Sequence, residues 1–265
     1  MQPDGLSLDA LRMPGATLTT RLKVYDTLTP DGQRGGTPHM HLMCSEMYFV
    51  LSGTGFVEMI DWNGFSRLPL SSHAALIFSP GTVHRLINPE GELELFIIMQ
   101  NSGLPERGDN VVSFKNEILR DDIAYQTAMK VSSFEDAYQR RDKGVEGFLD
   151  LKAAFDKGLD EGRRSLSQFF KHATERTKEL RSSWQTVIEK GPLYEAQKSL
   201  RQIENLAQGN DSYLHEASHF AISPDAYKTP GFCGALNRYF DPATLELEGV
   251  IKKGQESTRA LNEVL

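Results

Sequence analysis

The sequence predicts a mainly β N-terminal domain, residues 1–115, followed by an α-helical C-terminal region, residues 119–265. Two observations support this division. Eight of the 12 prolines fall at or before Pro105, and none follows until Pro192. Because proline is unfavourable inside helices, the proline-free stretch is typical of a helical block. The period of the hydrophobic pattern also changes near residue 118, from two residues to three and four.

Six short runs of β-branched and aromatic residues precede that point, separated by turns rich in Gly, Pro, Asn and Asp. The predicted strands are residues 18–25, 47–51, 55–60, 74–78, 84–87 and 93–99. Many short strands at this spacing indicate a β-sandwich or a β-barrel.

Two apolar stripes at helical spacing follow, one from Leu166 to Ile188 and one from Leu193 to Leu206. Gly191 and Pro192 separate them, which predicts a helical hairpin. A short helix is expected near residues 147–155, and one terminal helix within the otherwise loop-like residues 209–265. The stripes pack either on one another and the barrel or against a second copy, and a homodimer is the expected assembly.

The composition indicates which partners to expect. Hydrophobic residues make up 39% and charged residues 25%, which is typical of a soluble globular protein. The net charge of -7 lacks the basic surface that nucleic acids or anionic membranes attract, so we expect a small-molecule partner. No apolar run reaches the roughly 18 residues of a membrane span. The acidic N-terminus does not resemble a secretory signal and two cysteines build no disulfide framework, so we expect a cytoplasmic protein.

The stretch GTPHMHLMCSEMYFVLSGTG contains the residues that indicate chemistry. Alternate residues of a strand face the same side, so His39 and His41 project into one space. Glu46 starts the next strand, and His84 starts a later one after a Pro-Gly turn. Three imidazoles and one carboxylate suit iron, nickel, manganese, cobalt or zinc, and leave positions open for a substrate or water.

These residues resemble the two motifs of the cupin superfamily. The matching residues are His39, His41, Glu46 and Gly53 for the first motif, and Pro80, Gly81, His84 and Asn88 for the second. Two turn positions differ, since Gln33 stands where the family has a leading glycine and Pro80 directly precedes Gly81. The resemblance covers residues 18–115. It implies a small antiparallel β-barrel, a jelly roll, in which the three histidines and Glu46 hold one divalent metal ion.

A narrower similarity concerns the cupin module of sugar-phosphate isomerases of the mannose-6-phosphate type. It rests on VLSGTG and on the later HRL, NP and GD segments. It implies a hydroxyl-rich, sugar-like substrate and an isomerase that uses the metal as a Lewis acid. The sequence identifies no general base for that reaction.

Strand alternation also predicts two substrate contacts, Tyr48 and Gln100. Tyr48 shares the face of Glu46, and Gln100 ends a row that begins at Glu94 and is expected to face inward. Both side chains could equally fill space or support the ligands. Arg85 is expected to point outward and lie at the surface.

Two further functions stay open beside the isomerase. One is an iron- or nickel-dependent dioxygenase that uses the same four ligands. The other is a non-catalytic module that binds a small sugar-like ligand and relays its presence through the helices.

A competing metal motif is HEASH, residues 215–219, which fits the HExxH pattern of zinc peptidases. The segment between Gly209 and Pro224 is too short for a well-supported active-site helix, so we do not favour it. Cys44 is expected to fill space rather than bind metal, and His73 and His172 to be exposed.

Overall fold

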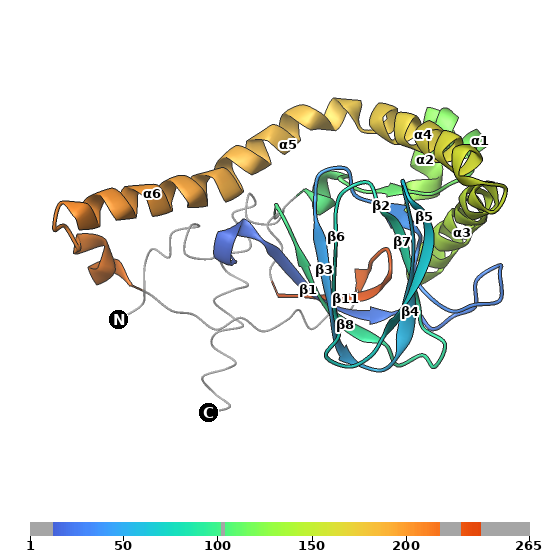
Figure 1. Cartoon of the computed structure of the whole chain (residues 1–265), viewed down its shortest axis with the longest axis horizontal. Helices are drawn as coiled ribbons and strands as arrows, with labels where there is room; N and C mark the ends of the chain where they lie inside the picture. Colours follow the sequence, from blue (N-terminus) through green and yellow to red (C-terminus); the bar gives the residue numbers. More distant parts are fainter. Residues whose placement is uncertain (1–12, 102–103, 218–228, 240–265) are drawn as a thin grey trace.

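Two antiparallel sheets face one another in a computed structural model, which describes residues 13–101, 104–217 and 229–239 (Figure 1). The larger sheet has the order β10-β11-β1-β8-β3-β6, and the smaller one β5-β4-β7-β2-β9. Strands of the larger sheet are β1 (Leu18–Val24), β3 (Glu46–Ser52), β6 (Ala75–Phe78), β8 (Glu94–Met99), β10 (Thr229–Pro230) and β11 (Gly234–Arg238). Those of the smaller sheet are β2 (His39–Met40), β4 (Gly55–Asp61), β5 (Gly64–Leu70), β7 (Val83–Ile87) and β9 (Val111–Val112). The predicted β-barrel is confirmed, and so is the helical region that follows it.

All six predicted strands are present, as β1, β3, β4, β6, β7 and β8. The strand β5 was not predicted, because its sequence GFSRLPL contains a proline and leaves four successive residues exposed. It pairs with β4 across the turn at Asn63 and Gly64. The strands β2 and β9 have two residues each, too few to show an alternation of apolar and polar residues in the sequence.

The predicted inward face of β8 is wrong. The buried row of this strand is Leu95, Ile97 and Met99, whereas the alternate residues that begin at Glu94 are only half-buried. Both rows are largely apolar, so hydrophobicity alone could not choose between them. Glu94, the first residue of the outward-facing row, forms an ion pair of 2.7 Å with Arg21 on the neighbouring strand β1.

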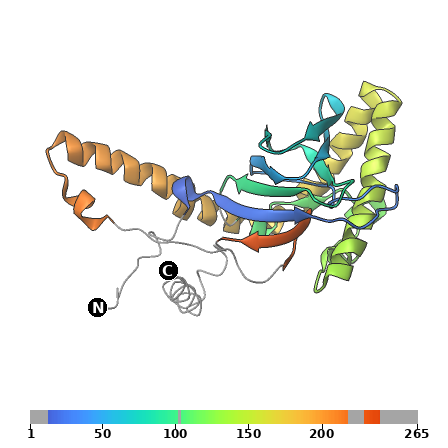
Figure 2. The ribbon, with the colours of Figure 1, turned by 90° about the horizontal axis from the view of Figure 1, so that it is seen from below.

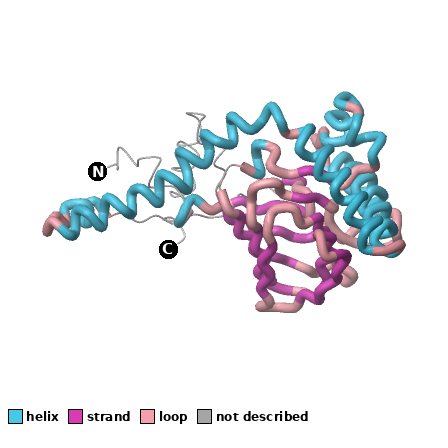
Figure 3. The backbone as a smooth tube through the Cα atoms, turned by 45° about the horizontal axis from the view of Figure 1, so that its top comes forward, coloured by secondary structure: helices cyan, strands magenta, loops and turns pink. Residues whose placement is uncertain are grey.

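The helices form a pair beside the barrel and an arm that leads away from it (Figures 1 and 3). They are α1 (Asn116–Arg120), α2 (Asp122–Met129), α3 (Phe134–Asp156), α4 (Leu159–Arg176), α5 (Arg181–Ile188) and α6 (Tyr194–Ala207). The helix predicted near residues 147–155 is the last part of α3. Ser133 caps the N-terminus of that helix, and its hydroxyl accepts a hydrogen bond of 3.1 Å from the backbone of Asp136. No helix among the described residues is long and apolar enough to cross a membrane.

The predicted helical hairpin is wrong. The chain continues from α5 into α6 through a π-helical turn, Glu189–Leu193, and the arm in Figure 3 extends without folding back. Gly191 takes up the bend with non-helical backbone angles, and Pro192 lies inside this turn, before α6 starts at Tyr194. No residue of α6 is buried, and Leu200 and Ile203 are 61% and 62% exposed. The homodimer stays a prediction.

Residues 229–239 belong to the barrel. The strand β11 pairs with β1 along its whole length, from Gly234 opposite Val24 to Arg238 opposite Thr20 (Figure 2). The region expected to be loop-like thus completes the larger sheet. Residues 240–265, where a terminal helix is expected, lie outside the described residues.

Arg85 is not a surface residue. Arg85 follows the inward-facing His84 on β7, so its side chain points out of the barrel, as predicted. It is nevertheless only 2% exposed because α3 covers that face of the sheet. Its guanidinium lies 2.6 Å from a carboxylate oxygen of Asp31 and 2.7 Å from one of Glu58, with the ring of Phe148 5.0 Å away. The helices thus convert an outer barrel face into a second core.

Close packing of α3 on the barrel predicts a strong effect at Gly147. A Cβ atom at this position would lie 2.1 Å from the carbonyl oxygen of Ser113, so Gly147→Ala must displace the helix from the segment that follows β9. We expect a loss of about 1–3 kcal/mol in the free energy of unfolding, measured with urea. The neighbouring exposed substitution Glu146→Ala should change it by less than about 0.5 kcal/mol. Equal stability of the two variants would contradict this account of the helix position.

Candidate metal centre

The structure brings together the four predicted ligands. His39 on β2 lies directly opposite His84 on β7, His41 follows β2, and Glu46 opens β3 in the facing sheet. One nitrogen or oxygen atom from each lies within 4.8 Å of the others, and none of the four residues is more than 4% exposed. The cluster therefore joins the two sheets inside the barrel.

Each histidine is held by a hydrogen bond between its Nδ1 atom and a backbone carbonyl. The partners are Thr37, Asp109 and Thr82, at 2.9, 2.6 and 3.0 Å from Nδ1 of His39, His41 and His84 in that order. A carbonyl oxygen only accepts hydrogen bonds, so Nδ1 must carry the proton. The lone pair of each ring is then on Nε2, which is the arrangement of metal-binding imidazoles.

The atoms that face one another in the cluster are poorly satisfied by the protein. Oε2 of Glu46 lies 3.4 Å from Nε2 of His41 and 3.3 Å from Nε2 of His84. Neither Oε2 of Glu46 nor Nε2 of His84 makes a hydrogen bond, although both are buried. Buried polar atoms are normally paired. A divalent cation between them would satisfy all four donors at once, so this donor set fits a metal ion.

The charges of the cluster are coupled. Burial acts to raise the pKa of Glu46, but contacts with His41 and His84 outweigh it and hold that pKa well below its usual range. Burial lowers the pKa of His39, helped by the other two imidazoles. Burial also acts to lower the pKa of His41, but Glu46 and Asp109 raise it overall. A proton on His41 competes with a metal ion for the same place, so metal affinity falls as the pH decreases.

Asp109 is a supporting residue that the sequence did not reveal. It is fully buried, and its carboxylate accepts three backbone N–H bonds of 3.0, 2.8 and 3.0 Å from Leu42, Met43 and Cys44. These bonds fix the loop between His41 and Glu46. Cys44 is buried outside the cluster, as predicted.

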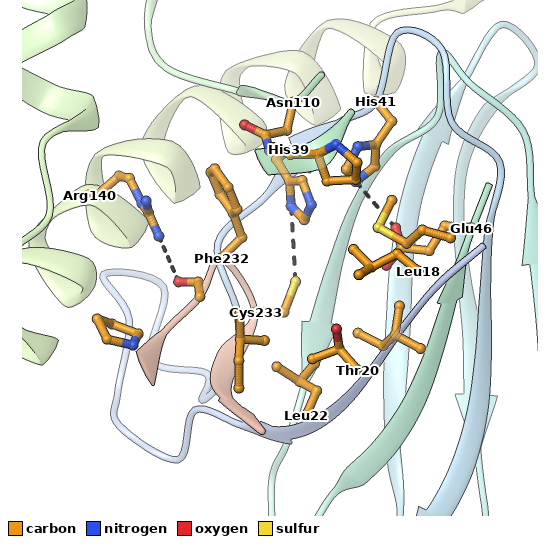
Figure 4. Close-up of a pocket in the computed structure, with 16 residues that line it drawn as sticks. Leu18, Thr20, Leu22, His39, His41, Glu46, Asn110, Arg140, Phe232 and Cys233 are labelled. Atoms are coloured by element: carbon orange, nitrogen blue, oxygen red, sulfur yellow. Dashed lines mark hydrogen bonds and ion pairs between the residues drawn. The ribbon is translucent and has the colours of Figure 1, made fainter. Parts of the chain in front are cut away.

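A cavity of about 170 Å³ opens onto the cluster (Figure 4). His39, His41 and Glu46 form its polar end. Most of the remaining wall is apolar and includes Leu18, Leu22, Ile97, Met99, Phe232 and Leu236. The cavity can therefore admit a small organic molecule to the open side of the cluster.

The loop between β10 and β11 closes one side of this cavity. The ring of Phe232 stacks on His39 with centroids 4.8 Å apart, and Sγ of Cys233 lies 4.0 Å from Nδ1 of that histidine. The backbone of Thr37 donates a 2.9 Å hydrogen bond to the carbonyl of Phe232. A Cβ atom at Gly36 would lie 2.6 Å from the backbone of Cys233, so this approach requires glycine. The Pro230-Gly231 turn was the available sequence signal for the hairpin.

The two predicted substrate contacts lie outside the cavity wall. Tyr48 faces inward as predicted but is fully buried, with its ring centroid 6.2 Å from that of His84. Gln100 is exposed and accepts a 3.3 Å hydrogen bond from the backbone of Ser45. Neither side chain lines the cavity. The inward direction predicted for Gln100 is wrong because the inward row of β8 is the other one, and both residues stay predictions as substrate contacts.

The remaining histidines do not join the cluster. His73 is exposed as predicted, and His172 on α4 is half-buried rather than exposed. His215 and Glu216 are exposed on the short helix Ser212–Glu216. His219 lies outside the described residues, so the HExxH motif stays untested.

The fold and the site define a class of protein: a small antiparallel β-barrel with a buried cluster of three histidines and one glutamate that can hold a metal ion. Residues 26–99 match the family model described as cupin domain, so this part of the chain is a cupin domain. No curated protein sequence matches the chain.

Several solved structures show a likeness to the barrel. WlaRA from Campylobacter jejuni, a TDP-fucose-3,4-ketoisomerase, is 14% identical with a TM-score of 0.26, over 32% of this chain and 58% of its own. KdgF from Halomonas sp. is 22% identical with a TM-score of 0.23, over 25% of this chain and 57% of its own. Pac13 of Streptomyces, a nucleoside dehydratase, is 14% identical with a TM-score of 0.29, over 38% of this chain and 72% of its own. The chain thus covers less than two thirds of the first two proteins, and these likenesses carry no conclusion about activity.

The role of Asp109 predicts that Asp109→Asn weakens metal binding. The amide would turn one N–H group towards a backbone N–H donor, so the loop before Glu46 would lose part of its support. We expect metal affinity to fall about 10–100-fold, as for other residues that support ligands, in competition with a chromogenic chelator. Asp61→Asn is the matched control, because Asp61 lies at the end of β4, outside the cluster, and accepts a backbone N–H bond from Asn63. Equal affinities of both variants would show that Asp109 does not support the site.

Proposed function

We propose that the chain is a metal-dependent enzyme that binds a small organic molecule through oxygen atoms inside the cupin barrel. The proposal depends on one observation: three histidine Nε2 atoms and one carboxylate converge inside the barrel. Two of these buried atoms, Oε2 of Glu46 and Nε2 of His84, make no hydrogen bond. A cluster with only a structural role would leave these buried atoms uncompensated. The adjoining cavity adds access for a second molecule, which a structural metal site does not need.

A divalent metal ion in this site supplies Lewis acidity, which polarises an oxygen atom of a bound ligand. The chain's own residues limit the reactions that can follow. Burial raises the pKa of the Tyr48 phenol well above its usual value, and the charge of Glu46 adds to this. Tyr48 therefore keeps its proton at neutral pH and can donate a hydrogen bond, but it cannot act as a base.

The cavity wall favours an oxidation over an isomerisation. Among the described residues that line the cavity, Arg140 and Cys233 are the titratable side chains outside the cluster. Burial raises the pKa of the Cys233 thiol, so it is a poor base as well. An aldose–ketose isomerase needs a base to move a proton between carbons, and a sugar needs polar partners for its hydroxyl groups. A dioxygenase needs no such transfer between carbons, and a wall that is mostly apolar, with Thr20, Asn110 and Arg140 as its polar side chains outside the cluster, supports it better.

Metal content tests the site directly. Elemental analysis of untagged protein purified without chelator should find close to one transition-metal ion per chain. His41→Ala should lose most of that metal, because it removes one ligand and the partner of Glu46. His73→Ala removes an exposed histidine outside the cluster and should keep the parent content. Equal metal in all three proteins would place the ion elsewhere.

Two parallel assays separate the reaction classes. Ferrous-loaded protein on an oxygen electrode, with a panel of diketones and phenolics, should consume oxygen with at least one compound. An aldose–ketose interconversion assay on sugar phosphates should give no turnover. Turnover in the second assay alone would favour the isomerase. Ligand-induced stabilisation without turnover in either would instead indicate the non-catalytic binding module.

A further inference from the structure

Arg140 on α3 is a buried cation without an acidic partner among the described residues. Its side chain is 6% exposed and lines the cavity. Nη2 donates a 2.6 Å hydrogen bond to the carbonyl of Gly231, while Nε is buried with no partner at all. Burying a charge without a counter-ion is costly, so a bound anion would stabilise the guanidinium of Arg140 in this position.

The other buried arginines of the described chain show what is missing. Arg85 contacts two carboxylates, and Arg141 contacts the carboxylate of Asp142 and several carbonyl oxygens. Arg140 and Arg141 are neighbours on one helix, so their different surroundings do not come from a general feature of α3. Burial lowers the pKa of Arg140, and the groups that act in the opposite direction are Tyr25, Cys233 and Tyr125, none of which is a carboxylate.

The protein contacts of Arg140 do not account for its charge. The carbonyl of Gly231 already accepts a 3.0 Å hydrogen bond from the hydroxyl of Tyr25, so it does not require the guanidinium. The ring of Phe232 lies 4.2 Å from Cζ and gives only a partial attraction. In Figure 4 this ring stands between Arg140 and His39, and a single cavity touches all three residues.

We infer that Arg140 binds an anionic group, a carboxylate or a phosphate, of the same small molecule whose oxygen atoms reach the histidine–glutamate cluster. A guanidinium pairs with either oxyanion through two parallel hydrogen bonds. Since the wall between the two ends is mostly apolar, the middle of that molecule is apolar too. The inference rests on the proposed function, because it takes the cavity as the entry to the metal.

Bifunctional probes can test both ends of the cavity separately. Linear hydroxamates of four to seven carbons, which chelate a metal at one end, would carry a carboxylate, a phosphonate or a methyl ester at the other. Binding to zinc-loaded protein is followed by isothermal titration calorimetry. We expect one anionic series to bind at least about tenfold more tightly than the neutral esters of the same length, the size of a charge-assisted hydrogen bond.

Substitutions at Arg140 assign the preference to this residue. Arg140→Gln keeps a donor for Gly231 and should abolish the preference for the anion while the esters bind as before. Arg140→Lys keeps the charge without the paired donors and should retain a reduced preference, which also covers the case that Arg140→Gln does not fold. Lys143→Gln removes an exposed charge from the same helix and should behave like the parent.

Each result has one meaning. Equal binding of anionic and neutral probes by the parent, or an unchanged preference in Arg140→Gln or in Arg140→Lys, overturns the inference. The proposed function survives those results, because the esters still report the metal end. Failure of every probe to bind zinc-loaded protein overturns both. Preference for the carboxylate or for the phosphonate then decides which anion the site takes.

Discussion

The hydrogen bonds between the three imidazole Nδ1 atoms and backbone carbonyls determine the character of this site. Without them each ring could rotate or take the other tautomer, and the lone pairs would no longer meet. Thr37, Asp109 and Thr82 supply the carbonyls from separate segments of the barrel. Each of the three stands one or two residues before a strand of the smaller sheet, β2, β9 or β7, so the geometry of the cluster depends on how these strands begin. Glu46 then balances the imidazoles from the opposite sheet, at a cost in buried charge that a bound cation would offset.

The cavity beside the cluster is built by parts of the chain that lie far apart in the sequence. The cupin match ends at residue 99, whereas Arg140 comes from α3 and Phe232 from the hairpin of β10 and β11. The hairpin is held by pairing with β1 and by bonds to Thr37 and Tyr25. The four residues of the cluster therefore all lie in the cupin match, whereas the cavity wall combines residues of that match with α3 and the hairpin. The part of the wall outside the match can vary while the cluster stays in place.

The four residues of the cluster could be predicted from the sequence because they follow short, regular spacings. Alternation along one strand groups His39 with His41, and the two cupin motifs add Glu46 and His84, which the pairing of β2 with β7 brings opposite His39. Arg140 could not be found in the same way, since the segment QRRDK resembles any charged helix surface. What buries it is the hairpin, whose pairing with β1 spans most of the chain. Gln100 was misplaced for a different reason: both faces of β8 are apolar, so alternation had nothing to separate.

The stacking of Arg140, Phe232 and His39 joins the two ends of the cavity physically. The guanidinium lies 4.2 Å from the ring of Phe232, which in turn lies 4.8 Å from the imidazole. An anion that draws Arg140 into a paired hydrogen bond would therefore act on the ring that presses against a metal ligand. Because Thr37 bonds both His39 and the hairpin, a shift of the hairpin also reaches the ligand through the backbone. An anion bound at Arg140 would therefore affect the position of His39 in the cluster through the contacts of Phe232 and Thr37.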